Sequence, residues 1–272
     1  MSIRTSSPAA PALLALLALL AMSPAAHALA TYDDFSGGAI SPFRWAASDS
    51  AAPGAVIVES RRVVASGQLR LESKSYLLDG PDNASTSHGV TFTRSRDIRE
   101  MRAAVTMRFA DQSSACGIFS GGFTAGQLIG SFFNASGTSK PGSRIDDVVA
   151  WVRAVYPRVQ LVTPGVSVTA GYGRCLDDRC QVINEESFAN LGSVPLGTKV
   201  TIQVSWDPTN HRFLFGKDAD ALQAMTYPYA DTHAAHDADK RMEILNSPAQ
   251  CTTPAYSYGG ADFDDVSTNT LP

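Results

Sequence analysis

The chain closes with Gly259-Gly260-Ala261-Asp262-Phe263-Asp264-Asp265-Val266, and a similar acidic and aromatic run, Tyr32-Asp33-Asp34-Phe35-Ser36, stands near its beginning. In an antiparallel sandwich the first and last strands are often neighbours, and pairing ties a chain end into the sheet. The two runs therefore predict terminal strands that lie side by side.

Between these runs the chain consists of short apolar segments separated by Gly, Pro, Asn, Asp and Ser, with no long helical period. Such a pattern is typical of an all-β protein. Residues 100–109 alternate most clearly, because every second side chain is apolar, as in a half-buried antiparallel strand. The sequence predicts an antiparallel β-sandwich with further strands at 56–58, 68–73, 116–123, 127–133, 147–156, 166–172, 181–183 and 241–245, and turns at 81–83 and 140–143.

A hairpin is predicted where residues 199–206 are followed by the turn 207–210 and a return strand over 211–215. Residues 217–240 read as a long surface loop with a short helix around 220–225. We expect its two histidines, His233 and His236, to be solvated rather than to bind metal.

Residues 1–30 have the features of a secretory signal: Arg4, an apolar run over 12–22, and small residues at Ala26-His27-Ala28 or Ala28-Leu29-Ala30. The apolar run is shorter than the roughly 20 residues that span a bilayer. We therefore expect export, with a secreted or periplasmic protein, and a single β-sandwich domain over residues 31–272.

The charge pattern restricts the partners. Without Arg4, the only charged residue of the first 30, the chain has 21 Lys and Arg against 26 Asp and Glu, a formal charge of −5. No basic run stands out, which argues against nucleic acid and anionic membranes as partners.

Four cysteines, an even number, favour two disulfides in an oxidising compartment. Cys175 and Cys180 bracket a polar turn, so a local Cys175–Cys180 bond is the expected pairing, which leaves Cys116 to meet Cys251. A zinc site is the alternative, although no tight cysteine pair with a nearby His supports it.

The opening Asp33-Asp34-Phe35-Ser36, with Trp45 about ten residues on, the strand Gly67 to Leu71 and the closing Phe263 to Val266 resemble secreted domains of the concanavalin A-like lectin/glucanase superfamily. The hairpin over 199–215, with its Trp-Asp corner and Phe-rich return, is similar to a second block of these proteins. The resemblance implies a jelly-roll β-sandwich that binds or cleaves glycans.

The retaining glucanases of this superfamily carry Glu-x-Asp-x-x-Glu or Glu-x-Asp-x-Glu on one strand, with carboxyl groups about 5 Å apart. This sequence has no such run, since Glu185 and Glu186 are adjacent and Glu59, Glu72, Glu100 and Glu243 stand singly. A polysaccharide lyase remains as an alternative, with Arg153, Tyr156 and Tyr172 as candidate groups.

Binding without cleavage would need aromatic and polar side chains on one surface, because a sugar ring offers a CH face and hydroxyls. The candidate ligand-binding residues are Trp151 and Arg153, which share a strand face, and Tyr172 on the next predicted strand. The competing interpretation places Trp151 in the core, as it does Trp45 and Trp206.

If the chain ends pair, Asp33, Asp264 and Asp265 come together with Asp34 and Asp262, and such oxygen ligands would suit a structural Ca²⁺ ion. The alternative is that these carboxylates accept hydrogen bonds from turn amides. We thus expect a lectin-like carbohydrate-binding protein without a glucanase carboxylate pair, with a glycan-active enzyme or a structural, adhesive domain as alternatives.

Overall fold

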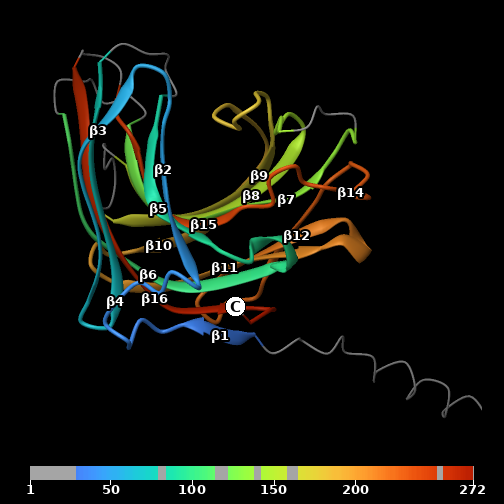
Figure 1. Cartoon of the computed structure of the whole chain (residues 1–272), viewed down its shortest axis with the longest axis horizontal. Coiled ribbons are helices and arrows are strands. Elements are labelled where there is room, and N and C mark those ends of the chain that lie inside the picture. The colour runs from blue at the N-terminus through green and yellow to red at the C-terminus, as the bar shows by residue number, and fades with distance from the viewer. Residues whose placement is uncertain are drawn as a thin grey trace, which may run out of the picture.

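The computed structural model describes residues 29–78, 84–113, 122–137, 142–157, 165–249 and 254–271. Two antiparallel eight-stranded sheets pack face to face, which confirms the predicted all-β sandwich (Figure 1). The first sheet, sheet A, has the order β13 (Gln223–Thr226), β12 (Arg212–Lys217), β11 (Lys199–Asp207), β6 (Glu100–Gln112), β16 (Ala255–Thr268), β4 (Gln68–Leu77) and β3 (Ala55–Ala65), with β1 (Ala30–Asp33) paired to β16.

The second sheet, sheet B, carries the candidate site. Its order is β10 (Ile183–Val194), β9 (Val166–Cys175), β8 (Asp147–Pro157), β7 (Phe123–Asn134), β15 (Lys240–Ser247), β5 (Thr86–Phe92) and β2 (Trp45–Ala51), with β14 (His233–Ala234) paired to β7. Two single turns of 3-10 helix occur among the described residues, at Ser95–Asp97 and Pro208–Asn210. None of the described helices is long and apolar enough to cross a membrane.

The predicted pairing of the chain ends is confirmed, because Ala30 lies opposite Thr268 and Asp33 opposite Val266 (Figure 1). β16 is longer than predicted and lies between β6 and β4. Phe263, fully buried on β16, faces the core together with the apolar residues of the opposing sheet.

The core lies between the inner faces of the two sheets, where strand alternation directs every second side chain inward. Sheet A contributes residues such as Leu69, Val105, Ile202 and Phe213, and sheet B contributes Leu128, Val152, Tyr172, Met242 and Ile244. An order-of-magnitude figure for each fully buried large apolar side chain is about 1.5–3 kcal/mol, so these contacts dominate the stability of the sandwich.

One prediction about a chain segment needs correction, and several others fall outside the described residues. The short helix expected around 220–225 is wrong: β13 occupies Gln223–Thr226 and pairs with β12, because Met225 packs into the core beside its partner Phe213. The hairpin over 199–215 is confirmed as β11 and β12. The signal segment up to residue 28, the turn at 81–83, most of the strand expected at 116–123 and part of the turn at 140–143 lie outside the described residues.

Candidate functional site

The outer face of sheet B, away from the core, carries a row of polar side chains on three adjacent strands. Arg153 of β8 lies opposite Gln127 of β7, and Gln127 lies opposite Glu243 of β15. Gln127 donates a hydrogen bond from Nε2 to Glu243 Oε1 at 2.6 Å. Because their neighbours Val152, Leu128 and Met242 face the core, alternation alone places this row outside.

A second row lies one step along the same strands and contains Trp151, Ile129 and Arg241. The Trp151 ring covers Gly171 of β9, where a Cβ atom would lie 2.8 Å from the ring and 2.6 Å from a main-chain oxygen. A glycine at this position therefore lets the indole approach the main chain of β9 closely.

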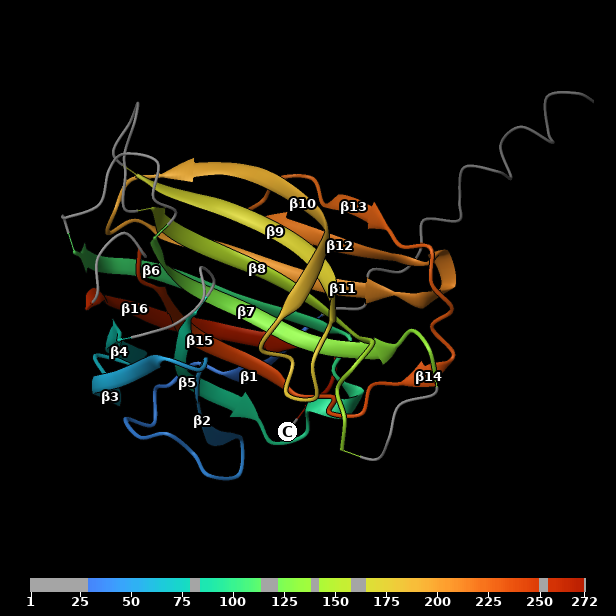
Figure 2. The same ribbon diagram turned by 90° about the horizontal axis from the view of Figure 1, so that it is seen from above.

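The hairpin between β9 and β10, residues 175–183, lies over the outer face of sheet B (Figure 2) and packs on Ile129 and Trp151 of the second row. The predicted disulfide Cys175–Cys180 is confirmed and packs with Ile183 on the cluster of Ile129, Val149 and Trp151. The other expected pair, Cys116 with Cys251, lies outside the described residues.

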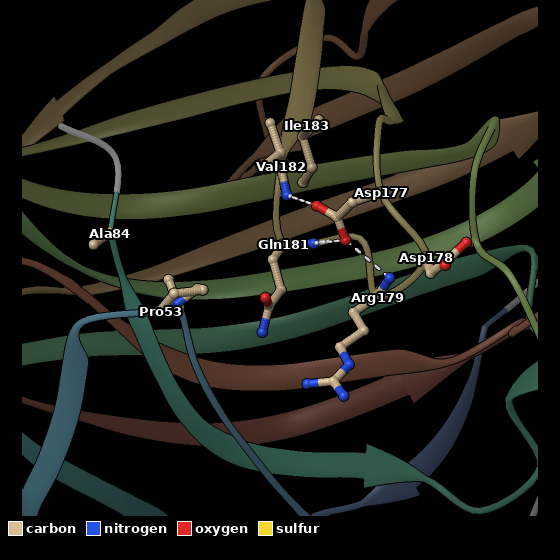
Figure 3. Close-up of a pocket in the computed structure, with 9 residues that line it drawn as sticks. Pro53, Ala84, Asp177, Asp178, Arg179, Gln181, Val182 and Ile183 are labelled. Carbon is tan, nitrogen blue, oxygen red and sulfur yellow. Dashed lines mark hydrogen bonds between the residues drawn. The ribbon is translucent and has the colours of Figure 1, made fainter. Parts of the chain in front are cut away.

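The carboxylate of Asp177 fixes the shape of this hairpin. It accepts hydrogen bonds from three main-chain amides, those of Arg179 (2.8 Å), Gln181 (3.1 Å) and Val182 (2.6 Å), as Figure 3 shows. The Gln181 side chain then donates to the Ala51 carbonyl oxygen at the end of β2, 3.2 Å away. The hairpin is thus linked to the opposite edge of the same sheet.

Between the hairpin and the sheet lies a groove of about 590 Å³. Its floor is the two rows, its walls are the hairpin and the ends of β2 and β5, and its lining is mainly polar. The lining residues are Asp49, Ser50, Ala51, Ala52, Ser85, Ser87, Gln127, Ile129, Arg144, Trp151, Arg153, Arg179, Cys180, Gln181, Ile183, Glu185, Asp237, Asp239, Arg241, Glu243 and Leu245. An adjoining pocket, which Figure 3 shows, lies between the hairpin and Ala52, Pro53 and Ala84.

Alternating charges occupy one end of the groove. Arg241 Nε lies 3.2 Å from Asp239 Oδ2 and 3.5 Å from Glu243 Oε2. Burial opposes the charge of Arg241, but Glu243, Asp239 and Asp237 together raise its pKa. Arg144 also binds Asp239, at 3.1 Å. These arginines are therefore already paired with carboxylates.

Arg153 differs from these arginines. Its guanidinium lies 4.9 Å from the centre of the Trp151 ring and 5.8 Å from that of Phe123. Burial lowers its pKa to about 10, although Glu185 and Glu243 act in the opposite direction. Among the described residues, Arg153 Nε is buried without a hydrogen bond, and so are Arg144 Nε, Arg241 Nε, Trp151 Nε1 and Glu243 Oε2. Beneath the groove there are thus buried polar atoms to which the described residues form no hydrogen bond.

The structure brings together only two of the three predicted ligand-binding residues. Trp151 and Arg153 are in contact on the groove floor, but Trp151 is 2% exposed under the disulfide. Tyr172 lies on the inner face of β9, in the core beside Phe213, and its hydroxyl donates to the Thr226 carbonyl. The prediction failed to separate these faces, because Tyr172 is paired with Ala150 rather than with Trp151.

The aspartates predicted to bind calcium are engaged in other contacts. Asp33 accepts hydrogen bonds from Trp45 Nε1 (2.7 Å) and from the Phe35 amide (2.9 Å). Asp264 and Asp265 form ion pairs with Lys199, at 3.3 and 2.8 Å. Among the described residues no three His, Cys, Asp or Glu side chains are arranged to hold a metal ion. These residues do not fit a calcium site, and calcium stays an untested prediction.

The histidines of residues 217–240 have different surroundings. His233 is exposed on β14 and was expected to be. His236 was expected to be solvated as well, but it is only partly exposed and lies 3.3 Å from the fully buried carboxylate of Asp147. Neither histidine lines the groove.

Of the groove residues, the sequence predicted Trp151 and Arg153 and missed the others, among them Gln127, Arg179 and Glu243. A signal for the last was present, because Asp237, Asp239, Arg241 and Glu243 alternate with period two. Charges repeated on one face of a central strand indicate a polar surface on a sheet whose other face is core. Gln127 and Arg179 have no comparable pattern.

Comparisons with known proteins returned structures only, since neither the family models nor the curated proteins gave a match. The chain is similar to a β-glucanase of Bacillus licheniformis (13% identity, 85% of this chain and 95% of that one, TM-score 0.40). It is also similar to a laminarinase from Flavobacterium sp. UMI-01 (8%, 87% and 100%, 0.46) and to an endo-β-1,3(4)-glucanase of family GH16 (10%, 87% and 90%, 0.43). Similarity this low carries no inference about the activity of this chain.

Proposed function

We propose that this chain is an exported, lectin-like protein that binds a stretch of glycan in the groove over the outer face of sheet B. The supporting observation is the polar floor that Arg153, Gln127 and Glu243 form on adjacent strands under a groove of about 590 Å³. Small-molecule sites commonly combine a shaped cavity with a few fixed polar groups, and sugar hydroxyls can both donate and accept hydrogen bonds to them.

The groove is less suited to cleavage. A lyase would need a proton donor beside Arg153, but none of the described residues that line the groove is a Tyr or a His. Hydrolysis would need two carboxylates on either side of the glycosidic bond. Asp239 and Glu243 are instead both paired with the Arg241 guanidinium, which lies between them. Binding without hydrolysis is therefore the function that these residues support best.

A glycan array on the purified protein, followed by titration calorimetry on the glycans that bind, tests this proposal. Ser50 is an exposed groove residue on β2, and Ser50→Trp should fill the groove and weaken binding at least about tenfold, the equivalent of 1.4 kcal/mol. Ser193→Trp, on the exposed part of β10 outside the groove, is the matched control and should bind as the wild type does.

Two outcomes would overturn the proposal. One is a wild-type protein that retains no glycan on the array. The other is release of new reducing ends from a bound glycan, which would make the chain an enzyme. Thermal melting followed by circular dichroism should show that both tryptophan variants are folded.

A further inference from the structure

Two of the four arginines that line the groove form no ion pair with a carboxylate of the described residues. Arg144 and Arg241 form ion pairs with Asp239. For Arg153 and Arg179, by contrast, no ion pair occurs with any residue in the described part of the chain. This division raises the question of what the free guanidinium groups bind.

Arg153 is held in place from below. Its guanidinium stacks on Trp151, which is itself fixed between Gly171 and the disulfide. Stacking on an aromatic ring leaves the edge of the guanidinium plane, where the N–H groups point, available for a planar partner. The cost of holding a desolvated cation without an ion pair is recovered when an anion binds.

Arg179 approaches the same groove from the hairpin. Its main-chain amide donates a hydrogen bond to the Asp177 carboxylate at 2.8 Å, which fixes the position of its Cα atom. Figure 3 shows the Arg179 side chain extending away from Asp177, so that carboxylate is used by main-chain amides. Arg179 is exposed and therefore free to move onto a ligand above the floor.

We propose that Arg153 and Arg179 bind an acidic group on the glycan, a sugar carboxylate or a sulfate ester, with Arg153 as the fixed anchor. This inference rests on the proposed function and names the substrate class of the same groove. Arginine forms paired, charge-assisted hydrogen bonds with both kinds of anion. Gln127 and Glu243, already bonded to each other, would contact neutral hydroxyls on the neighbouring sugar.

The carboxylates nearest to Arg153 do not replace such a ligand. Glu243 Oε1 accepts from Gln127, and its Oε2 lies near Arg241. Glu185 is an exposed residue on β10, and it affects Arg153 through space without an ion pair. An anionic sugar in the groove would thus meet one partly buried cation, Arg153, and one exposed cation, Arg179.

The experiment measures calorimetric affinity for three oligosaccharides of equal length: an oligogalacturonate, a sulfated galactan fragment and a neutral β-glucan fragment. At least one acidic oligosaccharide should bind more than about tenfold tighter than the neutral one, and the preferred acid identifies the source of the charge. Raising NaCl from 50 to 500 mM should weaken the acidic complex and leave the neutral one unchanged.

Variants then locate the effect. Arg153→Gln should weaken acidic binding by about 10- to 100-fold, with Arg153→Lys recovering part of it, and Arg179→Gln should weaken it by about two- to fivefold. Arg102→Gln, an exposed arginine on the outer side of β6, is the matched control and should have no effect.

Equal affinity for neutral and acidic oligosaccharides, or full acidic binding by Arg153→Gln, would overturn the anion site while leaving glycan binding intact. Absence of binding to all three oligosaccharides and to the array would remove the proposed function as well. A melting curve would reveal whether Arg153→Gln is unfolded. In that case the affinity of Arg179→Gln, a substitution on the exposed hairpin, decides whether the anion site exists.

Discussion

The inner and outer faces of sheet B are built from the same strands but meet different requirements. In β8 and β15, the core residues Val152 and Met242 immediately precede Arg153 and Glu243 of the groove. Inner side chains such as Val152 and Met242 are apolar and pack against sheet A. The outer ones include buried polar atoms without a hydrogen bond. The contrast suggests that stability resides on one face and recognition on the other.

The largest expected effect is the loss of stability when a core residue of the inner face is truncated. Phe133 is fully buried and stacks on Trp206 and Phe213, with centroid distances of 5.5 and 6.3 Å. Phe133→Ala should lower the free energy of unfolding by about 3–5 kcal/mol in urea denaturation. The exposed Phe188 of β10 provides the control, since Phe188→Ala should change it by less than about 0.5 kcal/mol. Equal losses would mean that the faces do not differ as described.

Removing the disulfide tests the cover of the outer face. Cys175→Ser combined with Cys180→Ser should cost about 2 kcal/mol, because the bond closes a short loop. The same variant should increase acrylamide quenching of tryptophan fluorescence, as Trp151 loses the packing of the sulfur atoms. Quenching identical to that of the wild type would show that the hairpin covers Trp151 without the bond.

Lys240 is a charged residue on the inner face, with Nζ donating to the Ser131 carbonyl at 2.8 Å. Burial lowers its pKa to about 8. Above that pH the folded protein has lost a proton that the unfolded chain still binds, so stability should rise from pH 8 towards 10 by about 1 kcal/mol per unit. Urea denaturation measures this slope, and Lys240→Met should lack it. A slope shared by both proteins would assign it to other groups.

Arg153→Met tests the outer face, where a substitution is expected to leave stability unchanged or to raise it. An unpaired, desolvated guanidinium is replaced by an apolar side chain of similar length, so stability should be unchanged or higher by up to about 1 kcal/mol. Acidic glycan binding should be lost at the same time. A destabilisation of the size expected for Phe133→Ala would make Arg153 a structural residue.

The smallest effect concerns the paired chain ends. Since Asp33 is bonded to Trp45 and Lys199 engages Asp264 and Asp265, the melting temperature should be the same with and without EDTA. A fall in the presence of EDTA that added Ca²⁺ reverses would confirm the calcium prediction.

Much of the fold could be predicted from the sequence, because local patterns of apolar and polar residues determine where its strands lie. The alternation of Met101, Ala103, Val105 and Met107 gave β6, and the paired acidic and aromatic runs gave the contact of β1 with β16. The helix expected before Met225 failed because edge pairing with β12 overrides local propensity.

Less of the candidate site could be predicted from the sequence. Trp151 and Arg153 were found because they share one strand face, which depends on spacing alone. Tyr172 was assigned to the wrong face, since its side depends on the register between β8 and β9. Arg179 and Gln127 reach the groove from a hairpin and from another strand, and only tertiary structure brings them together.

The position of β16 has a consequence for how the protein acquires its fold. The last strand of the chain is inserted between β4 and β6 in the middle of sheet A. Until residues 255–268 are available, β3 and β4 on one side and β6 and β11 to β13 on the other have no strand to join them. Strand pairing between residues far apart in the sequence slows folding. Until β16 pairs, the edges of β4 and β6 stay exposed. We expect a nascent chain that lacks this strand to depend on a chaperone.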